Sequence, residues 1–152
     1  MSTFTRSLRN PSYQFGSVTI LLYFASWGIW WSFFQIWLTS EAGGLQLTGS
    51  QVGTIYSANS AATLVLMLLY GTIQDRLDLK RNLTIVISAL MALVGPFAIF
   101  VYKPLLENNF GLGVALGSVF IAAAFVGSTG LFEAFVERLS RRNGFEFGQA
   151  RM

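Results

Sequence analysis

The chain has 152 residues, of which 53% are hydrophobic and 11% charged, and its mean hydropathy is +0.56. This composition excludes an ordinary soluble domain and is typical of a membrane protein. The net charge is +3, but the basic residues separate apolar stretches, which argues against nucleic-acid binding. Cysteine and histidine are both missing from the sequence, and with them the usual general base and the commonest transition-metal ligands. We therefore expect no enzyme activity, no metal site and no cofactor.

Four long stretches without a charged residue follow one another along the chain. They contain 31, 33, 21 and 25 residues. Each can hold a helix of about 20 residues, enough to cross a hydrocarbon core about 30 Å thick. We place the spans at about 15–38, 51–72, 83–104 and 109–136, and expect a fifth helix to start at about residue 145. The first run is longer than the roughly 7 to 15 residues of a signal-peptide core, so we expect it to be retained.

The first span contains the segment SWGIWWSFFQIW, in which Trp27, either Trp30 or Trp31, and Phe34 recur at helical spacing. Residues at these intervals share one face of a helix. Flat aromatic rings on such a face could stack on the apolar side of a sugar ring. Packing within the protein or contact with lipid is the alternative explanation for each ring.

The segments on either side of the second span are polar. SEAGGLQLTGS has the composition of a loop, and Thr48 or Ser50 is placed to cap the following helix. After the span, GTIQDRLDLKR forms a short connection with one glycine, an acid and basic residues. The candidate residues of a conformational loop motif are Gly71, Asp75, Arg76, Lys80 and Arg81. Anchoring at the membrane surface explains the cations but not Asp75.

Basic residues are distributed unequally between the two predicted sides of the membrane. Lys103 alone falls on one side. The other side has Arg6, Arg9, Arg76, Lys80, Arg81, Arg138, Arg141 and Arg142. Because cytoplasmic loops are enriched in lysine and arginine, we expect a multi-pass protein with a cytoplasmic N-terminus.

The fourth span begins with a glycine pair and ends with an acid. Gly113 and Gly117 have the GxxxG spacing that permits close helix approach. Glu133 follows 25 uncharged residues, and at the membrane centre its carboxylate would cost about 2.5 to 3.5 kcal/mol, so it would need a cation or water. The alternative is that Glu133 lies at the membrane interface.

Arg151 is the candidate partner of Glu133. It is 18 residues further along, so it returns toward the level of Glu133 only if the chain reverses at Asn143-Gly144 into an antiparallel fifth helix. The guanidinium offers five donors and the carboxylate accepts hydroxyl hydrogens. Together they would suit a neutral, polyhydroxylated ligand.

At these residues the chain resembles the lactose permease family, the oligosaccharide/proton symporters of the major facilitator superfamily. The resemblance covers all 152 residues and rests on WWSFFQIWL, GTIQDRLDLKR, GPFAIFVYKPLL and, most specifically, EAFVERLSRRNGFEFGQARM. It implies an all-α integral membrane fold with four transmembrane helices plus the start of a fifth. These would belong to the N-terminal six-helix bundle of a twelve-helix transporter, with the remainder of the chain missing.

The resemblance also implies roles for individual residues. Glu133 and Arg151 would contact the sugar hydroxyls, and Trp27 and Trp31 would line the same cavity. Thr129, one turn before Glu133, would face this cavity and tune the size of the accepted sugar.

The loop motif would take part in conformational switching through Asp75. Asp78 stands where the family's motif usually has glycine, which leaves the shape of the turn open.

The implied activity belongs to a full-length protein of the bacterial inner membrane. It would carry an oligosaccharide such as lactose, sucrose, raffinose or melibiose, with a proton as the coupling ion, by alternating access. Glu133 resembles lactose-type members, while the tryptophan-rich first span resembles the sucrose and raffinose types. Two other hypotheses stay open. One is a four-span scaffold that oligomerises through Gly113 and Gly117, and the other is a small dimeric drug exporter that uses Glu133.

Overall fold

A computed structural model describes the backbone of residues 10–76 and 81–144. It describes their side chains except those of residues 73–76, 81–84 and 127. Within these ranges the chain is helical and has no strand. The elements are α2 (Pro11–Thr39), α3 (Gly49–Arg76), α4 (Arg81–Ala92), α5 (Val94–Phe97), η1 (Ala98–Tyr102), α6 (Lys103–Asn108), α7 (Phe110–Ala124), η2 (Val126–Ser128) and α8 (Thr129–Asn143). By length and composition, three described helices can cross a membrane, or four spans if the bent α4 to α6 segment is one crossing. This confirms the expected all-α membrane class.

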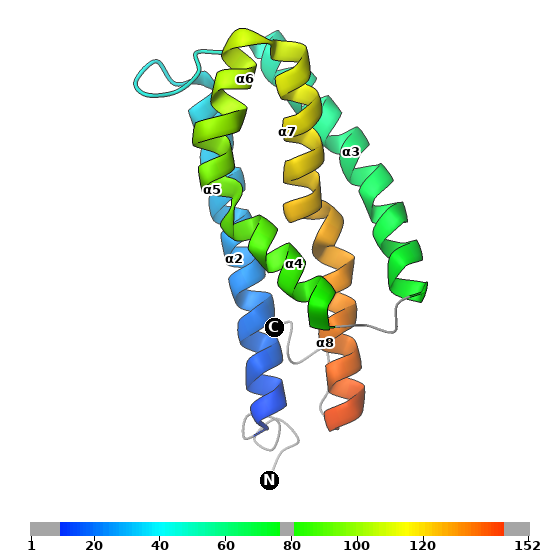
Figure 1. The fold of residues 1–152 in the computed structure, drawn as a ribbon. Coiled ribbons are helices and arrows are strands. Elements are labelled where there is room, and N and C mark those ends of the chain that lie inside the picture. The colour runs from blue at the N-terminus through cyan, green and yellow to red at the C-terminus, as the bar shows by residue number, and fades with distance from the viewer. Residues whose placement is uncertain (1–9, 77–80, 145–152) are drawn as a thin grey trace.

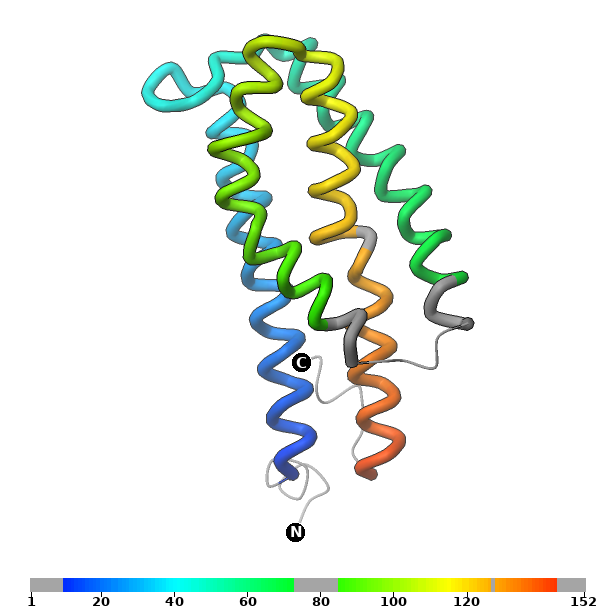
Figure 2. Tube along the Cα trace, in the orientation of Figure 1, coloured from blue at the N-terminus to red at the C-terminus, as the bar shows by residue number. Residues whose placement is uncertain are grey.

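The spans run alternately in opposite directions (Figure 1). The loop at 40–48 and the turn between α6 and α7 lie at one end, and the start of α2 and the end of α8 lie at the other (Figure 2). The most extensive packing is between α3 and α7, followed by α2 against α8 and α6 against α7. The fourth span is therefore in contact with each of the other three.

A hydrogen bond joins the start of α2 to the end of α8. The Asn10 side chain caps α2 by accepting from the backbone N–H of Ser12 at 3.0 Å. The amide nitrogen of the same side chain donates to the backbone carbonyl of Asn143 at 3.0 Å. Gly144 then closes α8 in the left-handed conformation, at φ +67°, where glycine carries no Cβ penalty. Asn143-Gly144 thus forms a regular helix cap, while the fifth helix expected after it lies outside the described residues.

The predicted cap of the second span is confirmed at Thr48. The Gln51 side chain accepts from the backbone N–H of Thr48 at 2.9 Å, and the Thr48 hydroxyl accepts from the backbone N–H of Gln51 at 3.4 Å. This reciprocal pair is a capping box, which satisfies two backbone donors at the helix start.

The third span is bent by 44° between α4 and α5. Pro96 lies just after the bend and has no backbone N–H for the carbonyl of Ala92, four residues earlier. Pro104 has the same effect on Phe100, which lies in the π-helical turn η1. Two prolines therefore account for the irregular course from α4 to α6.

The GxxxG pair packs the fourth span against the third. A Cβ on Gly117 would lie 2.0 Å from Cε2 of Tyr102, and one on Gly113 would lie 2.8 Å from the backbone nitrogen of Leu106. Tyr102 is fully buried in the larger hydrophobic core. Because the chain itself covers both glycines, they do not form the oligomerisation surface that the scaffold hypothesis requires.

Candidate functional site

A ladder of aromatic rings runs along one face of α2. Trp27 and Trp31 stack with centroids 6.5 Å apart and planes inclined by 30°, and Trp31 stacks on Phe34 at 6.3 Å and 27°. The shared helix face expected for these three residues is thus present. Trp31 is 38% exposed while Phe34 is 1% exposed. The ladder therefore leads from a buried ring in the core to an accessible indole.

Tyr56 on α3 lies against the accessible part of this ladder. Its ring meets Trp31 edge-on at 5.3 Å and Phe34 at 5.9 Å. Its hydroxyl gives the aromatic group a polar end, as tyrosine does where an apolar surface meets water. Sequence reasoning missed Tyr56 because a lone tyrosine in an apolar span carries no spacing signal.

Trp30, on the adjacent face of α2, packs against the larger hydrophobic core. Its ring stacks on Phe34 at 5.1 Å and on Phe125 at 6.2 Å. It therefore connects the first span to Phe125, the residue between α7 and η2 of the fourth span. The tryptophans at 30 and 31, adjacent in sequence, thus differ in environment, and only Trp31 presents an exposed ring.

Glu133 lies on α8, half-buried, ten residues before the helix ends at Asn143. At 1.5 Å per residue, this separation is about 15 Å. The preceding residue, Phe132, stacks on Tyr23 of α2 with centroids 4.4 Å apart. The acid is therefore on a part of α8 that packs closely on the first span.

Thr129, one turn before Glu133, is hydrogen-bonded to that same tyrosine. Its Oγ1 lies 2.9 Å from the Tyr23 hydroxyl. Tyr23 precedes Trp27 and Trp31 by one and two turns, so all three lie on one face of α2. The structure thus groups Trp27 with Trp31, and Thr129 with Tyr23, while Glu133 follows Phe132, which stacks on Tyr23. A sequence reading that looked for polar groups at the same spacing as the tryptophans could have found Tyr23.

A cleft of about 430 Å³ lies between α2, α4 and α8. Its polar lining consists of the hydroxyls of Thr19, Tyr23, Ser26 and Ser88. Trp27, Trp31, Thr129 and Glu133 do not line it. A second hollow, of about 350 Å³, is lined almost wholly by apolar side chains of α2 and the third span. Neither hollow coincides with the residues predicted to bind a ligand.

Several predicted residues fall outside the described part of the chain. Arg151 and Lys80 lie outside the described residues, as do the side chains of Asp75, Arg76 and Arg81. Gly71 is described, and nothing lies within 4 Å of the position that a Cβ would take there. Their predicted roles remain predictions.

Comparison with known proteins identifies relatives that match nearly the full length of this chain. The sequence profile of the LacY proton/sugar symporter family matches residues 5–152. The sucrose permease of Escherichia coli is 43% identical over 143 residues, which are 94% of this chain and 34% of that relative. The melibiose permease of Enterobacter cloacae subsp. cloacae is 35% identical over 143 residues, or 94% and 33%. The lactose permease of Klebsiella oxytoca is 36% identical over 120 residues, or 79% and 28%. The chain thus spans about a third of the length of these relatives.

Proposed function

Since this chain belongs to the LacY proton/sugar symporter family, we propose that it forms the N-terminal part of a transporter that carries an oligosaccharide together with a proton. The relatives are permeases, so the chain belongs to a family of transporters and not of enzymes. The whole protein would have twelve helices and would alternate between inward-facing and outward-facing states. The observation that carries the proposal is the stacked Trp27–Trp31 pair on α2, the helix that packs against α8, which holds Glu133.

The proposed sugar site combines flat apolar rings with groups that bind hydroxyls. Trp27 and Trp31 would stack on the C–H face of a pyranose ring, as aromatic faces do on other apolar surfaces. Glu133 would accept hydrogen bonds from the sugar hydroxyls, and Arg151 would donate to them. Thr129 would limit the space beside Glu133. A neutral, polyhydroxylated ligand matches this set, because the carboxylate and the guanidinium then balance each other.

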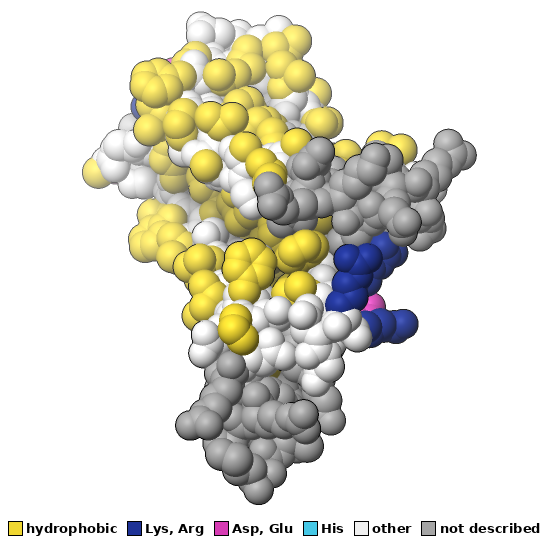
Figure 3. All heavy atoms as spheres, turned by 60° about the horizontal axis from the view of Figure 1, so that its bottom comes forward, with side chains coloured by type: hydrophobic (Ala, Val, Ile, Leu, Met, Phe, Trp, Pro, Cys, Tyr) yellow, Lys and Arg dark blue, Asp and Glu magenta, His cyan; other side chains and the backbone are white. Residues whose placement is uncertain are grey.

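The distribution of charge supports an N-terminus in the cytoplasm of a bacterial cell. Arg138, Arg141 and Arg142 are exposed near the end of α8, where Figure 3 shows basic side chains gathered beside an acid. Arg141 pairs there with Glu137 at 2.6 Å. Because basic residues concentrate on the cytoplasmic side, we propose that this end faces the cytoplasm and that the membrane is the inner one.

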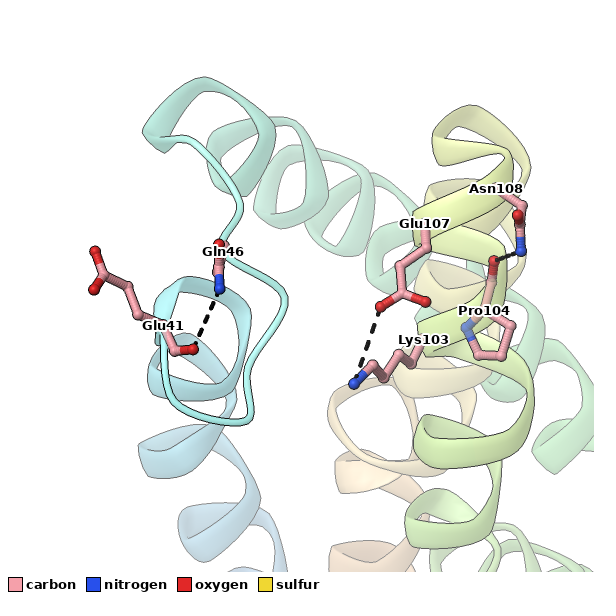
Figure 4. A network of polar contacts seen from close by, with 6 residues as sticks. All are labelled: Glu41, Gln46, Lys103, Pro104, Glu107 and Asn108. Atoms are coloured by element: carbon pink, nitrogen blue, oxygen red, sulfur yellow. Dashed lines mark hydrogen bonds and ion pairs between the residues drawn. The ribbon is translucent and has the colours of Figure 1, made fainter.

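The opposite end of the molecule has a different charge balance. Lys103 is its one described cation and lies 4.0 Å from Glu107, and Glu41 lies on the neighbouring loop (Figure 4). A single lysine paired with an acid supplies little net positive charge. This end would therefore face away from the cytoplasm, with α2 leading out and α3 returning.

The coupling ion in this proposal is the proton, and no other cofactor is required. Residues 1–152 contain no histidine, and their acids other than Glu133 lie outside the predicted spans. The coupling groups would therefore lie in the part of the transporter beyond this chain. The loop between α3 and α4, with Asp75, would participate in switching between the two states.

Uptake by the full-length protein tests the proposal. Cells that express it would be given radiolabelled sucrose, raffinose, melibiose and lactose, with and without a protonophore. We expect at least one of these sugars to accumulate and its accumulation to collapse when the proton gradient is removed. Sucrose is the first candidate because identity is 43% to a sucrose permease and 35% to a melibiose permease. Failure of all four sugars to accumulate, or accumulation insensitive to the protonophore, would contradict the proposal.

A further inference from the structure

The fourth span is broken where it passes Tyr23. α7 ends at Ala124, Phe125 has φ −117° and ψ −90°, and α8 begins at Thr129. Such a break releases backbone carbonyls from the helix ladder, and inside a bilayer each of them needs another donor. Ser128, which is fully buried, supplies two of these donors. Its backbone N–H donates to the Phe125 carbonyl at 3.0 Å, and its hydroxyl lies within donor distance of two carbonyl oxygens, that of Ala124 at 3.1 Å and that of Phe125 at 2.7 Å.

Tyr23 supplies a further donor from a different span. Its hydroxyl donates to the Phe125 carbonyl, and its oxygen lies 3.1 Å from Ser128 Oγ and 2.9 Å from Thr129 Oγ1. The tyrosine has one hydroxyl proton and Ser128 has one, and both are directed to backbone carbonyls. By proton count, the remaining donor to the tyrosine oxygen is the Thr129 hydroxyl. Tyr23 therefore links the end of α7 to the first residue of α8.

The ring of Tyr23 also fixes α8 by packing. It stacks on Phe132 with planes inclined by 30°, and both residues are 3% exposed. Phe132 is adjacent to Glu133, and Thr129 is one turn before it. The hydroxyl and the ring of Tyr23 thus contact α8 at two points on either side of the turn that leads to the acid. Two contacts of this kind restrict both the tilt and the rotation of the helix.

We propose that Tyr23 is a positioning residue, which sets the place of the Glu133 carboxylate relative to Trp27 and Trp31. Tyr23 stands on the same face of α2 as the two tryptophans, so the helix that presents the aromatic rings also orients the helix that presents the acid. The inference rests on the proposed function, since it gives that sugar site its internal alignment. It assigns Thr129 a role through its hydroxyl bond to Tyr23, in addition to any contact with the sugar.

Tyr70 offers a matched control for a hydroxyl deletion at Tyr23. It lies on α3, and its hydroxyl donates to the carbonyl of Ala123 at 3.2 Å, two residues before Phe125. It therefore anchors the end of α7 without a described bond to α8. Tyr70→Phe and Tyr23→Phe remove the same atom from the same side-chain type, beside the same helix end.

The test compares these two variants in the full-length permease. We expect Tyr23→Phe to raise the dissociation constant of the bound sugar, measured with sucrose, raffinose, melibiose and lactose, about five- to tenfold. Tyr70→Phe should leave it within about twofold, although both variants lower the melting temperature. Equal effects of the two variants on the dissociation constant would overturn the positioning role. Absence of sugar binding by the unmodified protein would instead contradict the proposed function.

A second measurement does not depend on sugar. Spin labels on cysteines at Leu116 of α7 and Arg138 of α8, both exposed, report the angle across the break. The absence of native cysteine from residues 1–152 simplifies this labelling. We expect Tyr23→Phe to broaden or shift the distance distribution and Tyr70→Phe to leave it unchanged. An unchanged distribution in Tyr23→Phe overturns the inference whether or not a sugar binds.

Discussion

The third and fourth spans are both broken, but for different reasons. In the third, Pro96 lacks the donor for Ala92, and the chain bends by 44° there. In the fourth, no proline occurs between Phe110 and Asn143, and the break at Phe125 is held by donors from Ser128 and from Tyr23 of another span. One break is encoded locally, while the other depends on a partner helix.

This difference matters for where a ligand site can be built. A proline bend persists whatever surrounds it, because the missing donor is a property of the chain. A break that a neighbouring span satisfies stays aligned with that span. The fourth span has the second kind of break between Phe125 and Thr129, and Thr129 is one turn before Glu133. The residue that satisfies this break, Tyr23, shares a helix face with Trp27 and Trp31. The acid and the aromatic rings are therefore aligned by the same contact.

The largest effect is expected where the two broken spans touch. Gly117→Ala would place a methyl group 2.0 Å from the Tyr102 ring, which is fully buried. Overpacking of this kind should lower the free energy of unfolding by about 2 to 3 kcal/mol. Gly130→Ala is the control, because nothing lies within 4 Å of its Cβ position, and it should stabilise α8 by up to about 1 kcal/mol. Thermal unfolding in detergent measures both, and equal stability of the two variants would refute the close packing.

A smaller effect is expected at the serine of the fourth-span break. Ser128→Ala removes a buried hydroxyl that donates to Phe125, and it should cost about 1 to 2 kcal/mol. Ser26→Ala is the control, since that hydroxyl donates to Leu22 at 2.7 Å in an exposed, unbroken part of α2. We expect the control to change stability by less than about 0.5 kcal/mol. A Ser128 variant as stable as the control would mean that the break does not need its side-chain donor.

The smallest effect on stability is expected at the proline bend. Pro96→Ala restores a backbone donor for the Ala92 carbonyl, which stabilises the folded chain. It also gives the unfolded chain more conformational freedom, which opposes folding. The net change in the free energy of unfolding should therefore stay within about 1 kcal/mol. Its effect on shape should be larger. Spin labels at Ile85 and Phe100, both exposed, should move apart as the span straightens. An unchanged distance would show that packing, and not Pro96, bends the third span.

Much of the fold follows from features that the sequence displays directly. The uncharged intervals indicate the number of spans, and the Thr48 cap and the Asn143-Gly144 turn follow from local chemistry. The Trp27–Trp31–Phe34 face follows from helical periodicity. The charge intervals do not indicate either break. Pro96 is a visible signal for the first. The second coincides with the Gly-Ser-Thr-Gly segment at 127–130, but the contact that satisfies it joins residues 102 positions apart, Tyr23 and Phe125, which no local pattern encodes.

The candidate site was predictable in its residues more than in its arrangement. Trp27, Trp31 and Glu133 stood out by type and spacing, and Thr129 followed from the family resemblance, but the contacts that Tyr23 makes with α8 depend on how α2 and α8 pack. Tyr56 was missed for the same reason, since its contact with Trp31 joins different spans. The partner proposed for Glu133, Arg151, lies outside the described residues.

One comparison tests the central claim most directly, namely that Glu133 binds the sugar. Glu137 is the matched control, because it lies one turn further along α8 and is already paired with Arg141 at 2.6 Å. In the full-length permease, Glu133→Gln should weaken sugar binding at least about tenfold, as expected when a charged acceptor of the sugar hydroxyls is lost. Glu137→Gln should leave the dissociation constant within about twofold. Equal dissociation constants for the two variants, in a protein that still binds the sugar, would contradict the account.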